Sequence, residues 1–562
     1  MKLLIGVIIA VVASATIIVA LTISKSTITK DSIEVYIPGQ GAVLGRIDET
    51  SWRQQKFFSF RGIPYAESPK GNLRFKPPKS RSPWYGTFDA RDFGKRCPVI
   101  TNLAQINSSQ LKEDLEDCLN LSVYTKNLDI KQPVMFYIYG GGFYNGSASD
   151  HLPQHLLEKD IVLVVSQYRI GALGWLTTLT DEMPGNVPVM DLMLALDWVQ
   201  KYIHLFGGDR KRVTIDGQSA GAAMSGALLL SPKSSEDYFQ RSIVQSGSIM
   251  ASWAINRQPL QQVERICAAL ACEDCKEKQK QFECLKQVNV LDMLKVTEDE
   301  SFSPVIGDVQ GILPDEPQIL LANLNRTIPL MTGFTKHDGS FALATFYNII
   351  VTQYGSILHL TVREFANKLI DIGKDSTGLS NNLLLRLLFK REILDTHNHK
   401  AAWPAYIDIA NIIFIKSPMI AYANALQRKA GSKPIYFYSF DYMGEHTRFG
   451  YEFGNSQYPF EGGVHHSNDN IYLFGTHQLN EKDTKFAKKI VDLWSSFVVN
   501  GVPKVEDEEK LLIKPMETES GPYFHVNAAV TLGVDILTEL TATVDDPENY
   551  KLIIRNDISK HS

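Results

Sequence analysis

The sequence predicts an α/β protein with a mostly parallel sheet flanked by helices. Continuous apolar runs at 134–139 and 161–165 are typical of strands buried on both faces. The stretch 191–203 has helical spacing, and it lies between these two strands and a further strand at 213–216. Strands that alternate with helices indicate parallel pairing through helical crossovers. In such sheets the active residues lie beyond the carboxyl ends of the strands.

Length and composition restrict the class of protein further. Large α/β enzymes reach 562 residues as one unit, and 44% apolar with 21% charged residues is ordinary for a globular chain. The net charge of −5, with no Lys/Arg tract, argues against a nucleic-acid partner. The sequence also shows no repeat of fixed period.

The first 24 residues differ from the rest. Lys2 precedes an uncharged run over 3–24, which fits either a signal peptide or an N-terminal membrane anchor. Both interpretations place the remaining chain in an oxidising compartment. The protein is therefore expected to be secreted, or lumenal or extracellular and anchored through residues 3–24. Residues 545–562 are predicted to form a polar C-terminal tail.

Cysteines and sequons agree with that compartment. The six cysteines form an even, clustered set suited to disulfides. Cys272 and Cys275 form a CxxC, but no second pair or nearby His pair completes a zinc site. Of four N-x-S/T sequons, those at Asn107 and Asn325 are expected to carry glycans.

The chain in order begins with short strands and turns over 31–80. The run 116–124 alternates as a strand does, and the buried strand 134–139 ends in three glycines, 140–142. Glycines at that place let backbone N–H groups turn toward a developing oxyanion, for which Gly141, Gly142 and Ala220 are the expected donors. A phosphate loop is less favoured because no Gly-Lys-Ser/Thr follows.

The central motif is Gly217-Gln218-Ser219-Ala220-Gly221, between a β-branched strand and a helix of small residues. This pattern is typical of a nucleophile elbow, a tight turn that exposes a serine above a sheet. In such a turn the helix passes close to the strand, and a Cβ at position 217 or 221 would clash. This predicts that glycine is required at both positions.

Further strands are expected at 241–247, 328–333 and 434–440. The second of these delivers Asp338 to the loop beyond it. A glycine-rich segment then carries His465 and His466, and a helix around 486–497 is expected to close the fold.

Ser219, Asp338 and His466 follow the chain order Ser, acid, His used on this type of sheet. A serine hydroxyl needs a base within hydrogen-bond reach, and the base needs an orienting carboxylate. His465 and His337 are rival candidates for the base. His337 is adjacent to Asp338 in sequence, so the Asp338 carboxylate cannot readily form the hydrogen bond that would orient its imidazole. Such a triad requires no metal and no organic cofactor, and none is expected.

Several motifs together resemble the type-B carboxylesterase/cholinesterase family. They are FRGIPYAESPKGNLRFKPP, EDCLNLSVY, YGGGFYNG, GGDRKRVTIDGQSAG, QSGS and GVHHSNDNIYLFG. The resemblance implies an α/β-hydrolase fold with a central mixed sheet over residues 30–540. Gln218 and the Gly463-x-x-His466-x-x-Asp469 spacing are similar to insect carboxylesterases, and the family's H-x₇-F-G pattern selects His466 over His465.

The resemblance also implies covalent and ionic contacts. The implied disulfides are Cys97–Cys118 and Cys272–Cys284, with Cys267 and Cys275 left as an extra pair. The implied structural ion pairs are Arg74–Glu116 and Arg169–Asp191. Three departures stand out: the acid is Asp338 rather than Glu, Leu192 replaces Gln, and no aromatic residue lies between Cys97 and Cys118. The last departure argues against acetylcholine as substrate.

The function expected from this resemblance is a serine carboxylic ester hydrolase. It would act on uncharged, fairly hydrophobic small-molecule esters through an acyl-enzyme intermediate. Two alternatives stay open: a cholinesterase-like adhesion protein with little or no catalysis, and a neutral-lipid lipase. The sequence does not decide the oligomeric state.

Overall fold

The computed structural model describes residues 27–28, 31–99, 115–373, 381–429, 431–454, 458–506 and 511–542. Within these residues, fourteen strands form one sheet in the order β1-β2-β3-β4-β6-β8-β7-β9-β10-β11-β12-β13-β14, with β5 beside β3. Neighbours from β8 to β13 are parallel, and those from β1 to β8 along this path are antiparallel. The sheet is therefore mixed, with a parallel centre, as the resemblance implies.

The strand bounds are β1 Thr27–Ile28, β2 Ser32–Ile37, β3 Gly41–Glu49, β4 Lys56–Pro64, β5 Thr87–Asp89, β6 Asn120–Thr125, β7 Gln132–Ile138, β8 Val162–Ser166, β9 Gly208–Gln218, β10 Arg241–Gln245, β11 Leu330–Thr335, β12 Ile435–Phe440, β13 Tyr523–Val526 and β14 Thr531–Gly533. The apolar runs predicted as buried strands coincide with β7 and β8, which are buried at every position. The run predicted to alternate contains β6, which pairs with β4 and β8 and is also buried at every position.

The helix bounds are α3 Gly171–Trp175, α4 Val187–Tyr202, α5 Ala220–Leu230, α6 Pro259–Ala269, α7 Lys278–Gln287, α8 Val290–Val296, α9 Pro317–Asn323, α10 Gly339–Tyr354, α11 Val362–Gly373, α12 Asn381–Leu388, α13 Arg391–Leu394, α14 His399–Ala410, α15 Ser417–Gln427, α16 Arg448–Phe453, α17 Asn468–Leu473 and α18 Glu481–Asn500. The helix expected over 191–203 is α4, and the one expected around 486–497 is α18.

The prediction that α18 closes the fold is wrong. After α18 the chain returns to the sheet, where β13 pairs parallel with β12 and β14 pairs antiparallel with β13. Tyr523–Val526 is too short a run for its periodicity to distinguish a strand from a loop. Pairing with the edge of β12 makes this segment a strand, and that pairing is not predictable from the segment's own sequence.

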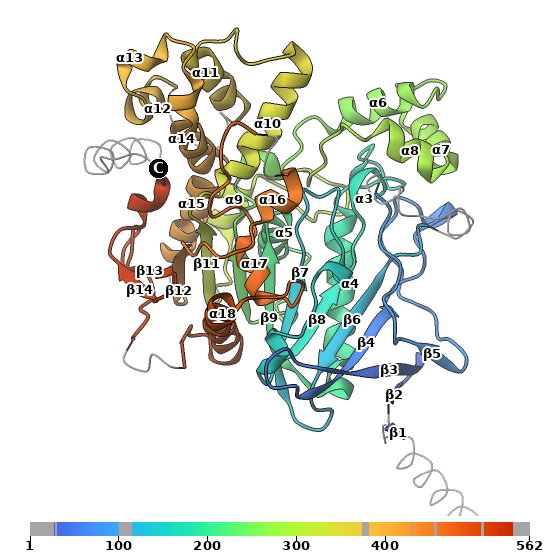
Figure 1. Cartoon of the computed structure of the whole chain (residues 1–562). Coiled ribbons are helices and arrows are strands. Elements are labelled where there is room, and N and C mark those ends of the chain that lie inside the picture. Colours follow the sequence, from blue (N-terminus) through green and yellow to red (C-terminus); the bar gives the residue numbers. More distant parts are fainter. Residues whose placement is uncertain are drawn as a thin grey trace, which may run out of the picture.

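Two groups of helices project beyond the same end of the sheet (Figure 1). One group, α10 to α14, follows β11, and the other, α6 to α8, follows β10. Both groups leave the carboxyl ends of parallel strands. The region between them is therefore where this type of sheet places its functional residues.

One continuous helical run, His399–Gln427, is long and apolar enough to cross a membrane, but 83% of its most apolar window is buried inside the protein. It joins α14 to α15 through a π-helical segment, η8 (Asn411–Lys416), all of which is buried. π-helical turns within α-helices often occur at functional sites. Here the segment packs against α10, which begins directly after Asp338.

Three disulfides connect the six cysteines. Cys97 is bonded to Cys118, Cys272 to Cys284, and Cys267 to Cys275. The last two bonds hold α6, α7 and the turn between them together. The predicted N-terminal segment 1–24, the tail 545–562 and Asn107 lie outside the described residues, whereas Asn325 lies on an exposed loop before β11.

Two buried ion pairs connect distant segments. Arg74 donates to both carboxylate oxygens of Glu116, at 2.7 and 2.5 Å. Arg169 donates in the same bidentate way to Asp191 of α4, at 2.8 and 2.7 Å. The side chains of Arg169 and Asp191 are 3% and 0% exposed. Removing one partner of such a pair leaves an uncompensated buried charge.

We expect Arg169→Met to lower the free energy of unfolding by about 3–5 kcal/mol, because the fully buried Asp191 carboxylate loses its charged partner. Urea denaturation followed by intrinsic fluorescence measures the change. The matched control is Arg428→Met, whose ion pair with Glu519 is about half exposed on both sides and should contribute less than about 1 kcal/mol. Equal losses in the two variants would contradict this account of Arg169.

Candidate active site

Ser219 lies in the turn between β9 and α5, where its backbone has φ 57° and ψ −123°. Few non-glycine residues adopt a positive φ, and this turn is strained. The flanking glycines allow the close approach: a Cβ on Gly217 would lie 2.2 Å from the Gly221 carbonyl oxygen, and a Cβ on Gly221 would lie 2.0 Å from that of Ile138. The turn therefore has the geometry of a nucleophile elbow.

The glycine loop follows β7, the strand beside β9. Gly141 and Gly142 have φ of 117° and 59°, and a Cβ on Gly141 would lie 2.3 Å from the Asn145 carbonyl oxygen. Within the described residues, neither glycine's N–H donates a hydrogen bond. The N–H of Ala220 belongs to the first turn of α5, where helical partners are lacking. Three backbone donors are thus free beside Ser219.

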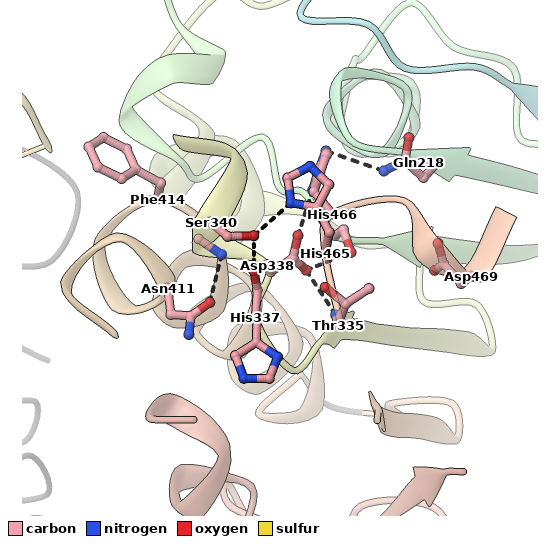
Figure 2. Close-up of polar contacts among 12 residues, drawn as sticks. Gln218, Thr335, His337, Asp338, Ser340, Asn411, Phe414, His465, His466 and Asp469 are labelled. Atoms are coloured by element: carbon pink, nitrogen blue, oxygen red, sulfur yellow. Dashed lines mark hydrogen bonds and ion pairs between the residues drawn. The ribbon is translucent and has the colours of Figure 1, made fainter. Parts of the chain in front are cut away.

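His466 and Asp338 are in direct contact. His466 Nδ1 lies 2.5 Å from Asp338 Oδ1, and both side chains are buried (Figure 2). The other ring nitrogen, Nε2, lies 3.3 Å from the side-chain nitrogen of Gln218, the residue before Ser219. Because Nδ1–H donates to the carboxylate, Nε2 carries the lone pair that a general base requires, and in this structure that lone pair faces the Gln218 amide N–H.

The carboxylate of Asp338 is held by more than His466. Its Oδ2 accepts hydrogen bonds from Ser246 Oγ at 2.7 Å and from the Thr335 backbone N–H at 2.9 Å. The N–H of Gly339 donates to Asn411 Oδ1 at 2.6 Å, which fixes the start of α10 on the π-helical segment (Figure 2). No sequence motif predicts that Ser246, Thr335 and Asn411 support this carboxylate. Nothing local to Asn411 could have revealed a contact 72 residues away.

The two partners shift each other's pKa. Burial alone raises the pKa of Asp338 and lowers that of His466, but their mutual attraction and hydrogen bond outweigh it. The pKa of Asp338 is therefore lowered and that of His466 raised from the ordinary values. Burial raises the pKa of neighbouring Asp469 to about 7 and that of Asp216 well above its usual range. Asp338 is thus the carboxylate that remains charged beneath the imidazole.

The rival histidines occupy other positions. His465 is fully buried, with Nδ1 2.6 Å from Ser340 Oγ and Nε2 3.7 Å from a carboxylate oxygen of Glu452. His337 accepts a hydrogen bond from the Val464 N–H at Nδ1, and burial lowers its pKa to about 4. Figure 2 shows the ring of His337 turned away from Asp338. Of these three histidines, the structure brings His466 to Asp338.

Ser219 and His466 line two adjoining cavities, of about 550 and 570 Å³. Gly142 lines both, and Gly141 lines the first. The first cavity has a polar wall and the second a largely apolar one. The predicted serine, base and two of the three oxyanion donors therefore share one accessible space, and the third, Ala220, is adjacent to Ser219 in sequence.

A separate group of possible metal ligands lies where β12 meets β13. Asp441, His525 and Glu539 each offer one atom that could bind a metal ion, and these three atoms lie within 4.8 Å of one another. His525 Nδ1 is already 2.6 Å from Asp441 Oδ2, and Tyr523 donates to Glu539. In the part of the chain that the structure describes, none of these residues lines either cavity at Ser219. The group is an internal hydrogen-bonded network.

Comparison with known proteins identifies the family of this chain. The family model described as "Carboxylesterase family" matches residues 31–542. Similar proteins include juvenile hormone esterase of Tribolium castaneum, 31% identical over 82% of this chain and 83% of that protein. Carboxylesterase 1C of Rattus norvegicus is 29% identical over 83% and 85%. The match to glutactin of Drosophila melanogaster, 28% identical, covers 84% of this chain but 47% of glutactin.

The chain therefore belongs to the carboxylesterase family, and its fold is the α/β-hydrolase fold.

We predict that the His466 imidazole titrates above the 6.5 of an unperturbed ring, because the Asp338 charge stabilises its protonated form. In Asp338→Asn that charge is gone and burial remains, so the pKa should fall below 6.5. NMR of protein carrying ¹³C-labelled histidine measures both values, with His466→Gln for assignment. Asp441→Asn is the matched control: it should lower the pKa of His525 and leave that of His466 unchanged.

Proposed function

We propose that this protein is a serine carboxylic ester hydrolase that acts on uncharged, fairly hydrophobic small-molecule esters. The observation that carries the proposal is the buried contact of 2.5 Å between His466 Nδ1 and Asp338 Oδ1. That contact orients an imidazole whose other nitrogen borders the same cavities as Ser219. Family membership, and relatives named as esterases, support the same reaction class.

The mechanism is a two-step acyl transfer. Nε2 of His466 takes the proton of Ser219 as Oγ attacks the ester carbonyl carbon. The oxyanion receives hydrogen bonds from the N–H groups of Gly141, Gly142 and Ala220, each worth about 10²–10³ in rate. His466 then gives its proton to the leaving alcohol, and water releases the acid from the acyl-enzyme by the same route. Asp338 holds the tautomer throughout.

The apolar cavity supports a hydrophobic substrate. Its wall includes Trp253, Phe302, Phe346 and Phe414. Burial of hydrocarbon against such side chains contributes roughly 25 cal/mol per Å² of apolar surface. Three disulfides fit an oxidising compartment, which supports a secreted or membrane-anchored lumenal protein with glycans at Asn107 and Asn325.

The adhesion alternative is less well supported. A binding protein has no need for three free backbone donors beside a serine, or for a buried charged pair that tunes a histidine. A neutral-lipid lipase would use the same catalytic groups. The size of the acyl and alcohol groups that fit beside Ser219 therefore decides between an esterase and a lipase.

Ser219→Ala should reduce hydrolysis of a short p-nitrophenyl ester by about 10⁶-fold, because the acyl-enzyme can no longer form. The buried turn loses only a hydroxyl, so the thermal midpoint should stay near that of the wild type. Initial rates and a thermal melt measure the two quantities. The matched control is Ser248→Ala, which removes a buried hydroxyl from the adjoining loop after β10. Retained turnover in Ser219→Ala would contradict the proposal.

We predict that His466→Ala is crippling and that His465→Ala is mild in folded protein. The first change removes the base, and the second removes contacts to Ser340 and Glu452 outside the reacting atoms. kcat for the two purified variants, each checked by circular dichroism, measures the difference. The reverse order would show that His465 is the base.

The pH dependence of kcat/KM should follow the protonation of His466. kcat/KM requires neutral His466, so it should rise with pH through a midpoint above 6.5 and be lost as pH falls below it. A pH profile of kcat/KM from 5 to 9 measures the midpoint. A midpoint clearly below 6.5 would mean that Asp338 does not support the base during the reaction.

A further inference from the structure

A buried lysine lies behind the loop that carries Asp338. Lys416 is the last residue of the π-helical segment η8, and it is fully buried. Its Nζ donates hydrogen bonds to two backbone carbonyl oxygens, those of Lys336 at 2.8 Å and of Glu539 at 2.6 Å. The same ammonium lies 4.9 Å from the centre of the Phe334 ring in β11. Two carbonyl oxygens and one aromatic face therefore match the three N–H groups of an ammonium.

This arrangement keeps a charged group in the protein interior. Moving an ammonium out of water is costly unless its hydrogen bonds and its charge are compensated. Burial lowers the pKa of Lys416, and the negative charges of Asp408, Glu539 and Asp338 oppose that shift. A methionine of similar length would fill the same space without this cost. What distinguishes the lysine from such an apolar side chain is the set of groups that its N–H donors hold.

Those donors act on the backbone just before Asp338. The Lys336 carbonyl oxygen, two residues before the acid, receives hydrogen bonds from Lys416 and, at 3.4 Å, from Asn411 Nδ2. On the other side of the acid, Asn411 Oδ1 accepts a hydrogen bond from the N–H of Gly339 (Figure 2). The first and last residues of η8 therefore hold the loop both before and after the acid.

The wide turn of η8 lets both of its ends reach the loop. Asn411 and Lys416 are five residues apart, which is the spacing of a π-helical hydrogen bond. On an α-helix, residues five apart point about 140° away from each other, whereas a wider turn brings them toward one face. A Cβ on Gly339 would lie 2.1 Å from the Asn411 backbone nitrogen. The loop therefore rests directly on η8.

The position of this loop matters because aspartate is the shorter of the two acids that serve in such triads. Its side chain has one methylene fewer than glutamate with which to make up a displacement of the backbone. Asp338 Oδ1 nevertheless lies 2.5 Å from His466 Nδ1. A misplacement of about 1 Å costs up to about 10²-fold in rate. A short acid therefore needs a fixed loop to stay within reach of the imidazole.

We propose that Lys416 is a positioning residue: by fixing the backbone before Asp338, it sets the distance from that carboxylate to His466. Asn411 fixes the backbone on the other side of the acid. Neither side chain is among the described residues that line the two cavities beside the serine, so both act through the acid rather than on the ester. The proposal rests on the serine hydrolase function proposed above and concerns how the same site is held.

Lys416→Met removes the donors and keeps most of the length of the side chain. We expect kcat for a p-nitrophenyl ester to fall about tenfold and KM to change less than about twofold, because the acid moves while the cavities do not. Phe414 and Ile415 of η8 line the more apolar cavity, so a general displacement of this segment would raise KM instead. The matched control is Lys159→Met, which removes a mostly buried lysine that pairs with Asp492 before β8, at the amino ends of the parallel strands. This control should leave kcat unchanged.

A longer acid provides a test that a mere loss of stability does not imitate. In the wild type, Asp338→Glu should lower kcat about tenfold, because the added methylene does not fit a fixed loop. In Lys416→Met the loop can only move away from the imidazole, since the contact of 2.5 Å is already short, and a glutamate then bridges the gap. The double variant should therefore be about tenfold below the wild type, whereas independent effects would multiply to about a hundredfold.

Asn411→Ala takes the place of Lys416→Met if the latter does not fold. It removes the contacts to Lys336 and Gly339 from the first residue of η8, and its loss of kcat should likewise fail to multiply with that of Asp338→Glu. Circular dichroism and a thermal melt identify the variants that are folded at the assay temperature.

The possible outcomes separate this proposal from the function on which it rests. The proposal would be overturned by an unchanged kcat in folded Lys416→Met, by an equal fall in Lys159→Met, by losses that multiply in the double variant, or by full activity in Asp338→Glu. Each of these results leaves the hydrolase function standing. Failure of the wild-type protein to hydrolyse any p-nitrophenyl ester would overturn the hydrolase function itself.

Discussion

The buried hydrogen bond between Asp338 and His466 is the interaction on which the rest of the site depends. Desolvation opposes the charge on each partner, and their attraction at 2.5 Å overcomes that opposition. Either side chain alone in this place would shift toward its neutral form. The supports around Asp338, from Ser246, Thr335 and the Gly339–Asn411 contact, keep the carboxylate where the pair can form.

The sheet gives that pair its place beside the serine. Parallel strands β7, β9 and β11 end at the same edge, so the glycine loop, Ser219 and Asp338 arrive together although they are distant in sequence. Close approach of α5 to β7 requires glycine at 221, since a Cβ there would lie 2.0 Å from the Ile138 carbonyl oxygen. Helices α10 and α11 beyond this end of the sheet supply part of the wall of the more apolar cavity, through residues such as Phe346 and Ile372.

Much of this arrangement was predictable from the sequence, and the reason is local. Apolar runs such as 134–139, the Gly-x-Ser-x-Gly turn, and the order of Ser219, Asp338 and His466 are all visible in short stretches. The parts that escaped prediction depend on long-range contacts: the pairing of β13 with β12, the support of Gly339 by Asn411, and the burial of β6 on both faces. The polar residues that line one of the two cavities at Ser219 were also not predictable, because Arg96, His151 and Arg448 come from three separate segments.

The most direct test of the central claim is labelling of the folded protein with a fluorophosphonate probe, with the modified residue mapped by mass spectrometry. Phosphonylation requires a serine activated by its base and oxyanion donors, whichever ester is the natural substrate. The account predicts one adduct, on Ser219, which disappears in His466→Ala. Folded protein that gives no adduct on Ser219 would contradict it and would favour a binding role for the same fold.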